Sequence, residues 1–115
     1  MAFTGEIRNA ATGVIGATIF TNQTATGDGG WFEIKALKRW AVHVTDLSGT
    51  DVVTVSVSLA ASQPADLADD IVHSTLSADG IIAEPDNTYK YIKIHKSTAD
   101  GSPGNTDAVF MGWSR

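Results

Sequence analysis

Residues 51–59 read Asp-Val-Val-Thr-Val-Ser-Val-Ser-Leu, and this stretch decides the fold class. In an extended chain, successive side chains point to opposite faces. Large apolar residues then line one face of the segment and small hydroxyl side chains line the other: Val53, Val55, Val57 and Leu59 against Thr54, Ser56 and Ser58. The alternation predicts a β-strand with an apolar, buried face and a solvated one.

The preceding segment, residues 39–45, alternates in the same way. One face carries apolar side chains and the other carries polar ones: Trp40, Val42 and Val44 against Arg39, His43 and Thr45. Residues 46–51 between the two segments are rich in Asp, Ser and Gly, which favour turns. The simplest arrangement is therefore an antiparallel hairpin of the two segments.

Shorter β-forming runs separated by turn residues occupy the rest of the chain. We expect strands over 16–20, 31–34, 71–75, 81–83, 88–96 and 107–113. About seven to eight strands with turns this closely spaced predict an all-β fold, an antiparallel β-sandwich of jelly-roll-like type or a small barrel. Residues 1–15 are expected to form an N-terminal arm or edge strand, and residues 16–115 a single β-sandwich domain. The tryptophans Trp31, Trp40 and Trp113 are expected in its core.

Composition excludes several classes of protein. The chain has 115 residues, enough for one domain, with 43% hydrophobic and 18% charged residues. Its net charge of −5 disfavours binding to nucleic acid, and no apolar run is long enough to span a membrane as a helix. The first residues lack the basic and apolar segments of a signal peptide. Cysteine is absent, so disulfides and thiolate chemistry are absent as well.

No motif in the chain predicts catalysis, and we expect no enzyme, cofactor or metal site. The nucleophile elbow, the phosphate loop and the dinucleotide fingerprint are all missing. The three histidines, His43, His73 and His95, do not have the spacing of a preformed metal site. The acidic loop at Asp66–Asp70 lacks the pattern of a calcium loop, and whether it binds a cation stays open.

The segment 88–96 carries the candidate interface. Ile92 and Ile94 share one face, with Lys90 and Lys96 at its ends, and the other face carries Tyr89, Tyr91, Lys93 and His95. This second face is too apolar for ordinary solvated surface and too polar for an ordinary core. Three interpretations remain open: a subunit interface, in which Tyr is enriched, a platform on which sugars stack, or a face covered by a loop or by the N-terminal arm.

The order of elements in the second half resembles a known family. The valine-rich strand at 51–62 is followed by Ser77-Ala78-Asp79-Gly80, a turn at Pro85, a strand at 89–94, a Gly-rich loop and a last strand at 108–113. This order resembles small β-sandwich virion proteins of tailed bacteriophages, including head decoration (cement) proteins. The chain departs from the family pattern at 62–70, where a turn motif is replaced by SQPADLADD, and at Lys93, where Arg is usual.

The resemblance implies a non-enzymatic structural protein of the virion, assembled in the host cytoplasm. Its expected partners are the major capsid protein, whose outer surface it would bind, and copies of itself in a homo-oligomer, either trimer or dimer. The early residues, with Phe3 and Ile7, would then order on the capsid or on a sister subunit. The alternatives are a tail tube, tip or fibre module, and a carbohydrate-binding module that uses Trp31, Tyr89 or Tyr91.

Overall fold

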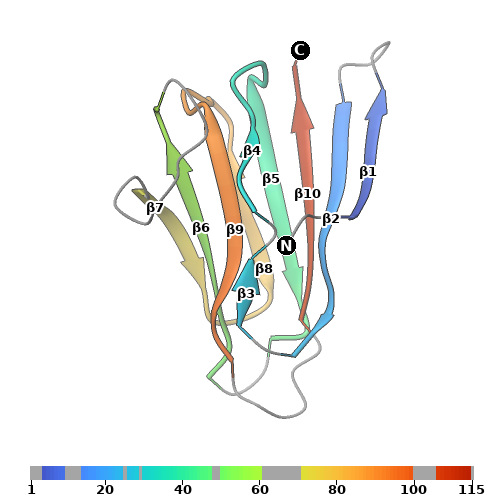
Figure 1. Cartoon of the computed structure of the whole chain (residues 1–115), viewed down its shortest axis with the longest axis vertical. Helices are drawn as coiled ribbons and strands as arrows, with labels where there is room; N and C mark the ends of the chain where they lie inside the picture. Colours follow the sequence, from blue (N-terminus) through green and yellow to red (C-terminus); the bar gives the residue numbers. More distant parts are fainter. Residues whose placement is uncertain are drawn as a thin grey trace.

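The alternating segments of the chain form two antiparallel sheets that pack face to face (Figure 1). The computed structural model describes residues 4–9, 14–24, 26–28, 30–47, 50–60, 71–99 and 106–114, and only the backbone of residues 4–9, 22 and 28. Sheet A has the order β1 (Thr4–Asn9), β2 (Val14–Gln23), β10 (Thr106–Trp113), β5 (Arg39–Thr45), β8 (Gly80–Glu84). Sheet B has the order β3 (Gly27–Asp28), β9 (Tyr91–Thr98), β6 (Val52–Ser58), β7 (Ile71–Leu76), and β4 (Phe32–Glu33) also pairs with β9.

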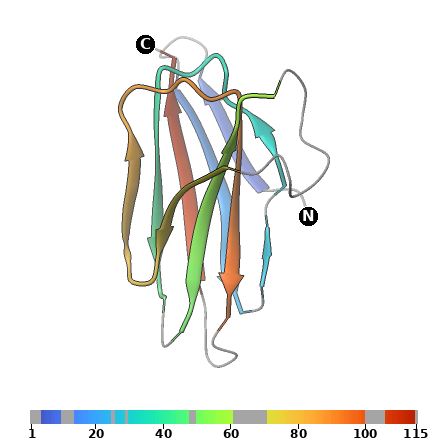
Figure 2. The ribbon, with the colours of Figure 1, turned by 90° about the vertical axis from the view of Figure 1, so that its left-hand side faces the viewer.

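This strand order is that of a jelly roll. From β2 onward the chain crosses between the sheets at almost every connection, so that β2-β10-β5-β8 faces β3/β4-β9-β6-β7. In Figure 2 the strands β7, β6 and β9 of sheet B lie in front of those of sheet A. Among the described residues, eight strands have five or more residues and two have only two. The prediction of a jelly-roll-like β-sandwich is confirmed.

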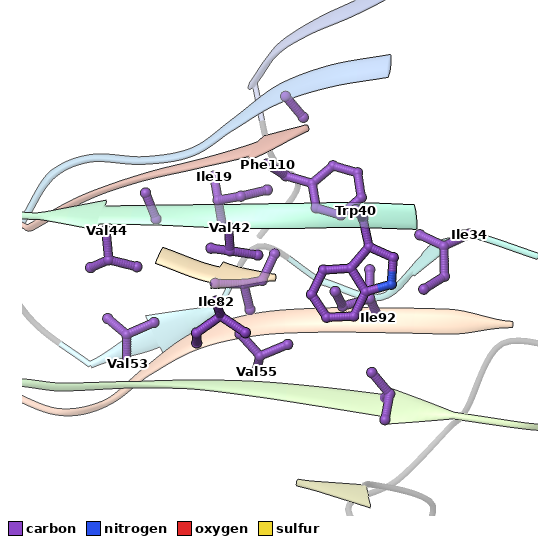
Figure 3. Close-up of a cluster of buried hydrophobic side chains, with 14 of the residues drawn as sticks. Ile19, Ile34, Trp40, Val42, Val44, Val53, Val55, Ile82, Ile92 and Phe110 are labelled. Carbon is purple, nitrogen blue, oxygen red and sulfur yellow. The ribbon is translucent and has the colours of Figure 1, made fainter. Parts of the chain in front are cut away.

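The predicted hairpin of residues 39–45 and 51–59 is wrong, although both strands are present. β5 pairs with β10 and β8 in sheet A, whereas β6 pairs with β9 and β7 in sheet B. Figure 3 shows Val42 and Val44 above Val53 and Val55, and all four are fully buried. Two strands with one apolar face each can bury those faces by packing face to face as well as by pairing edge to edge. The short turn between them does not decide which occurs.

Aromatic and branched side chains fill the space between the sheets. Trp40 and Phe110 from sheet A meet Ile34 and Ile92 from the side of sheet B (Figure 3). In β2 the register with β10 shifts between Thr18 and Phe20, as in a β-bulge. The bulge lets two consecutive residues, Ile19 and Phe20, both enter the core.

The hydroxyl face of β6 is buried, contrary to the expectation of a solvated face. Ser56 is only 1% exposed, and Thr54 and Ser58 are also buried. Their hydroxyls are bonded on the outside of sheet B: the Thr54 hydroxyl lies 2.9 Å from that of Ser97, and the Ser56 hydroxyl lies 3.3 Å from Nε2 of His95. The face is polar in composition yet closed to solvent, because its small hydroxyl side chains lie beside the longer side chains of Lys93 and His95 on β9.

A buried ion pair closes one end of the core. Lys96 continues the apolar face of Ile92 and Ile94, as the alternation predicts, and its side chain is fully buried. Its Nζ donates to the carbonyl of Gln23 at 2.7 Å and lies 3.5 Å from Oδ1 of Asp51, which is also fully buried. A buried charge needs such partners, because desolvation without them costs several kcal/mol.

The Asn87 side chain joins the β8–β9 connection to the chain that leads into β5. Its Nδ2 donates to the carbonyls of Ile34, Leu37 and Tyr89 at 3.0 to 3.2 Å. Its Oδ1 accepts from the indole Nε1 of Trp40 at 3.0 Å. One amide therefore satisfies several backbone groups in a turn and positions the largest core side chain.

The buried ion pair gives a first prediction. Lys96→Met leaves the Asp51 carboxylate buried without its cation, and we expect it to lower the free energy of unfolding by about 3–5 kcal/mol. The double variant Asp51→Asn/Lys96→Met should lose less than the sum of the two single losses, by more than about 1 kcal/mol. Urea denaturation of the three variants measures this. Strictly additive losses would contradict the coupling.

The Asn87 network gives a second prediction. Asn87→Asp keeps the shape of the side chain but replaces its donors with oxygen atoms that face three carbonyls. We expect a loss of about 2–4 kcal/mol in the free energy of unfolding, measured by thermal or chemical denaturation. The neighbouring control Asp86→Asn, at an exposed position, should change stability by no more than about 0.5 kcal/mol. Equal effects at both positions would show that the amide does not hold the turn.

Candidate interaction surface

The predicted tyrosine face does not exist as a single surface. The ring of Tyr89 turns toward the core, where it meets the ring of His73 edge-on at 5.9 Å, and His73 in turn lies 5.0 Å from Trp40. Tyr91 lies on the outer side of sheet B but is only 8% exposed. The strand β9 begins at Tyr91, so the alternation of side chains between the two faces of the sheet does not extend back to Tyr89.

Lys93 and His95, the other two residues of the predicted interface, are bonded within the domain. Lys93 is buried, and its Nζ lies 5.0 Å from the ring centroid of Trp31. His95 is half-buried beside the Ser56 hydroxyl. Trp31 is itself half-buried, not in the core as predicted. On β9 and β6 the outer side of sheet B is therefore a closed polar layer that offers neither tyrosine as a ring on which a sugar could stack, whereas Val72 on the edge strand β7 is 61% exposed.

Two further candidates for the interface lie in the N-terminal segment. Phe3 falls outside the described residues. Ile7 lies in β1, where its backbone pairs with Gly16, and its side chain is not described. The structure places β1 at one edge of sheet A, paired with β2.

The structure brings no metal-binding group together in its described part. His73 lies half-buried against Glu84, with Nε2 3.1 Å from Oε1. His43 is exposed on the outer side of sheet A, and His95 is half-buried on the outer side of sheet B. No cluster of three or more His, Asp or Glu side chains suited to a metal occurs among the described residues. The acidic loop at Asp66–Asp70 lies outside them. Within the same part of the chain, no helix is long and apolar enough to cross a membrane.

The outer side of sheet A was not among the surfaces that we expected from the sequence. Strand register places Ile81, His43, Val109 and Thr18 in one row across β8, β5, β10 and β2, and Ala83, Ala41, Met111 and Gly16 in the next row. Three large apolar side chains are exposed there: Ile81 by 63%, Val109 by 42% and Met111 by 37%. We call Ile81, Ala83, Ala41, Val109 and Met111 the apolar face.

The apolar face extends from β10 across β5 to the edge strand β8 and contains several small residues. Alanines occupy two of its strands, and a Cβ placed on Gly16 would lie 3.5 Å from the sulfur of Met111. At its rim the Arg39 guanidinium lies 4.8 Å from the ring centroid of Trp113, which is half-buried and not in the core as predicted. A contiguous exposed apolar patch with Met, Arg and Trp at its margin is typical of surfaces that bind other proteins.

One signal in the sequence points to this face. In β10 both sets of alternating residues are apolar, because Ala108 and Phe110 alternate with Val109, Met111 and Trp113. The core takes Ala108 and Phe110, both fully buried, and leaves the other set outside. A strand that is apolar on both faces either lies between two layers or carries an interface.

The two faces of β10 can be tested against each other. Val109→Lys places a charge on an exposed position, and we expect the free energy of unfolding to change by less than about 1 kcal/mol. Phe110→Lys places the same charge in the core and should prevent folding or cost more than about 4 kcal/mol. Far-ultraviolet circular dichroism with urea denaturation measures both. Comparable losses would show that Val109 is also a core residue.

No protein-family model matches the chain, and no curated protein matches it. Among solved structures, the chain is similar to one in the crystal structure of Drosophila melanogaster CENP-C bound to CAL1, with a TM-score of 0.43 and 10% sequence identity. That similarity covers 91% of this chain and 66% of the other. At this TM-score it carries no argument about this protein.

Proposed function

We propose that the chain is a non-enzymatic virion structural protein of a tailed bacteriophage, a head decoration protein that binds the outside of the capsid shell. The observation that carries the proposal is the apolar face of sheet A, because exposed apolar patches of this kind mark surfaces that bind other proteins. The partner would be the major capsid protein, and the assembled virion its location.

The elements that resemble the phage family support the same proposal. The valine-rich strand is β6, the Ser77–Gly80 turn leads into β8, and the two later strands are β9 and β10. They form a jelly roll, an architecture that occurs in viral capsid domains and also in lectins. Because one fold serves many functions, the choice depends on the exposed surface and not on the architecture.

The size of the outer side of sheet A suits a protein partner. Its five strands, spaced about 4.8 Å apart, span roughly 19 Å from the first to the last, and strands of seven or eight residues extend about 25 Å. The resulting area of roughly 500 Å² is more than half of the ~800 Å² that each partner contributes to a standard interface. A decoration protein seated over a joint between two shell subunits would strengthen the joint, because it binds the assembled state alone.

The chemistry of the surface predicts how binding responds to salt. The exposed side chains of the apolar face carry no charge, so burial of apolar area would drive binding. Charge screening acts on ion pairs and hardly on apolar contacts. Binding to the shell should therefore persist at high ionic strength.

The decisive experiment is reconstitution on purified particles. The protein should be present in virions at a copy number comparable to that of the shell subunit, and removing it should make the capsids more fragile. Val109→Lys should fail to rebind to stripped capsids, and the matched control Thr75→Lys, exposed on sheet B, should rebind normally. Absence from purified particles would overturn the proposal. A copy number far below that of the shell subunit would place the protein in the tail.

A further inference from the structure

Sheet edges expose backbone groups that can pair with another strand, and natural proteins usually obstruct them. Three of the edges in the described part of this structure are obstructed. β1 and β7 pair with their neighbours through shifted registers, and β3 and β4 have only two residues each. Irregular or very short edge strands are poor templates for pairing.

The remaining edge of sheet A is regular. β8 pairs with β5 over five consecutive residues without a register shift, and among the described strands β5 is its only partner. In Figure 2, β8 runs along the left-hand margin of the molecule. Its sequence, Gly-Ile-Ile-Ala-Glu, holds no Lys or Pro that would discourage pairing.

The carboxylates of Glu84 in β8 and Asp79 in the turn before it are engaged within the domain. Glu84, the single charged residue of β8, lies 3.1 Å from Nε2 of His73 and accepts from the backbone N–H of Asp86 at 3.4 Å. Asp79, in the turn before β8, accepts from the backbone N–H of Leu47 at 2.9 Å. Because both carboxylates have partners within the domain, neither projects as an unpaired charge that would oppose pairing with another strand.

We propose that β8 pairs antiparallel with β8 of a second copy of this chain, around a two-fold axis at Ile82. This is the register that pairs all five residues of the strand. On the outer side it sets the large Ile81 of one copy against the small Ala83 of the other. On the inner side it sets Glu84 against Gly80, which keeps the two Glu84 carboxylates apart. The strand is therefore complementary to itself, as a two-fold interface requires.

The pairing joins the two sheets A into one continuous sheet of ten strands, five from each copy. Both apolar faces then lie on the same side of the joined sheet. The pairing itself does not depend on the proposed virion role. One consequence rests on the proposed function: the dimer would present two apolar faces to the capsid and span a joint between shell subunits.

The first test is the mass of the free protein in solution, without capsids. Sedimentation equilibrium should give twice the 12.1 kDa of one chain. The protein concentration should be roughly 100 μM, because an interface as small as one strand pair binds weakly. Ile81→Lys, at a well-exposed edge position, should give the monomer mass. His43→Lys, in the same row but on the inner neighbour β5, should stay dimeric. A monomeric wild-type protein overturns the proposal, and so does equal loss of dimer in both variants, which would indicate face-to-face contact.

The second test fixes the register and does not disturb the edge. The chain has no cysteine, so single cysteines report only on the positions where they are placed. Residues directly opposite in antiparallel strands have Cα atoms about 4.5–5.5 Å apart, which suits a disulfide. A mixture of Ile81→Cys and Ala83→Cys proteins should oxidise to a cross-linked dimer at least several-fold faster than either protein alone. Equal rates in the mixture and in Ile81→Cys alone would rule out the proposed axis.

Discussion

The contact between the apolar faces of β5 and β6 is the constraint on which the rest of the structure depends. Val42 and Val44 of one sheet and Val53 and Val55 of the other are fully buried between the layers. Burying each such side chain contributes about 1.5–3 kcal/mol, and the strands that flank β5 and β6 extend the same layer. Any polar group within it needs its own partner, and Lys96 has one in Asp51 at the end of the core.

A sandwich with one shared core leaves two outer sides, and in this protein they differ in chemistry. On sheet B, hydroxyls, Lys93 and His95 pack closely and contact one another, Trp31 or other groups of the domain. On sheet A, Ile81, Val109 and Met111 stay exposed on β8 and β10, whereas the exposed apolar residues of sheet B, Ile71 and Val72, lie on its edge strand β7. The proposed docking surface therefore lies on sheet A, although the sequence favoured the tyrosine-bearing segment 88–96.

The errors of the sequence-based interpretation share one physical cause. Alternation assigns each side chain to one of two faces but does not say what covers either face. It therefore placed Trp113 in the core, where the structure leaves it half-buried under Arg39. It also took Ser56 for a solvated residue, whereas the neighbours on β9 bury it. Tyr89 was assigned to the wrong face because the strand begins two residues later and Asn87 sets the direction of the turn.

The sequence by itself determined the all-β class, the approximate positions of β5, β6, β9 and β10, and the place of Lys96 on the core face. These properties depend on local alternation, because each residue in a strand is constrained by its immediate neighbours along the chain. Only the tertiary structure decided that β5 and β6 face each other, that β8 ends sheet A with a regular edge, and that one side of β10 stays exposed. Those outcomes depend on pairings between strands far apart in the chain, and the pattern of a single strand fits several partners equally well.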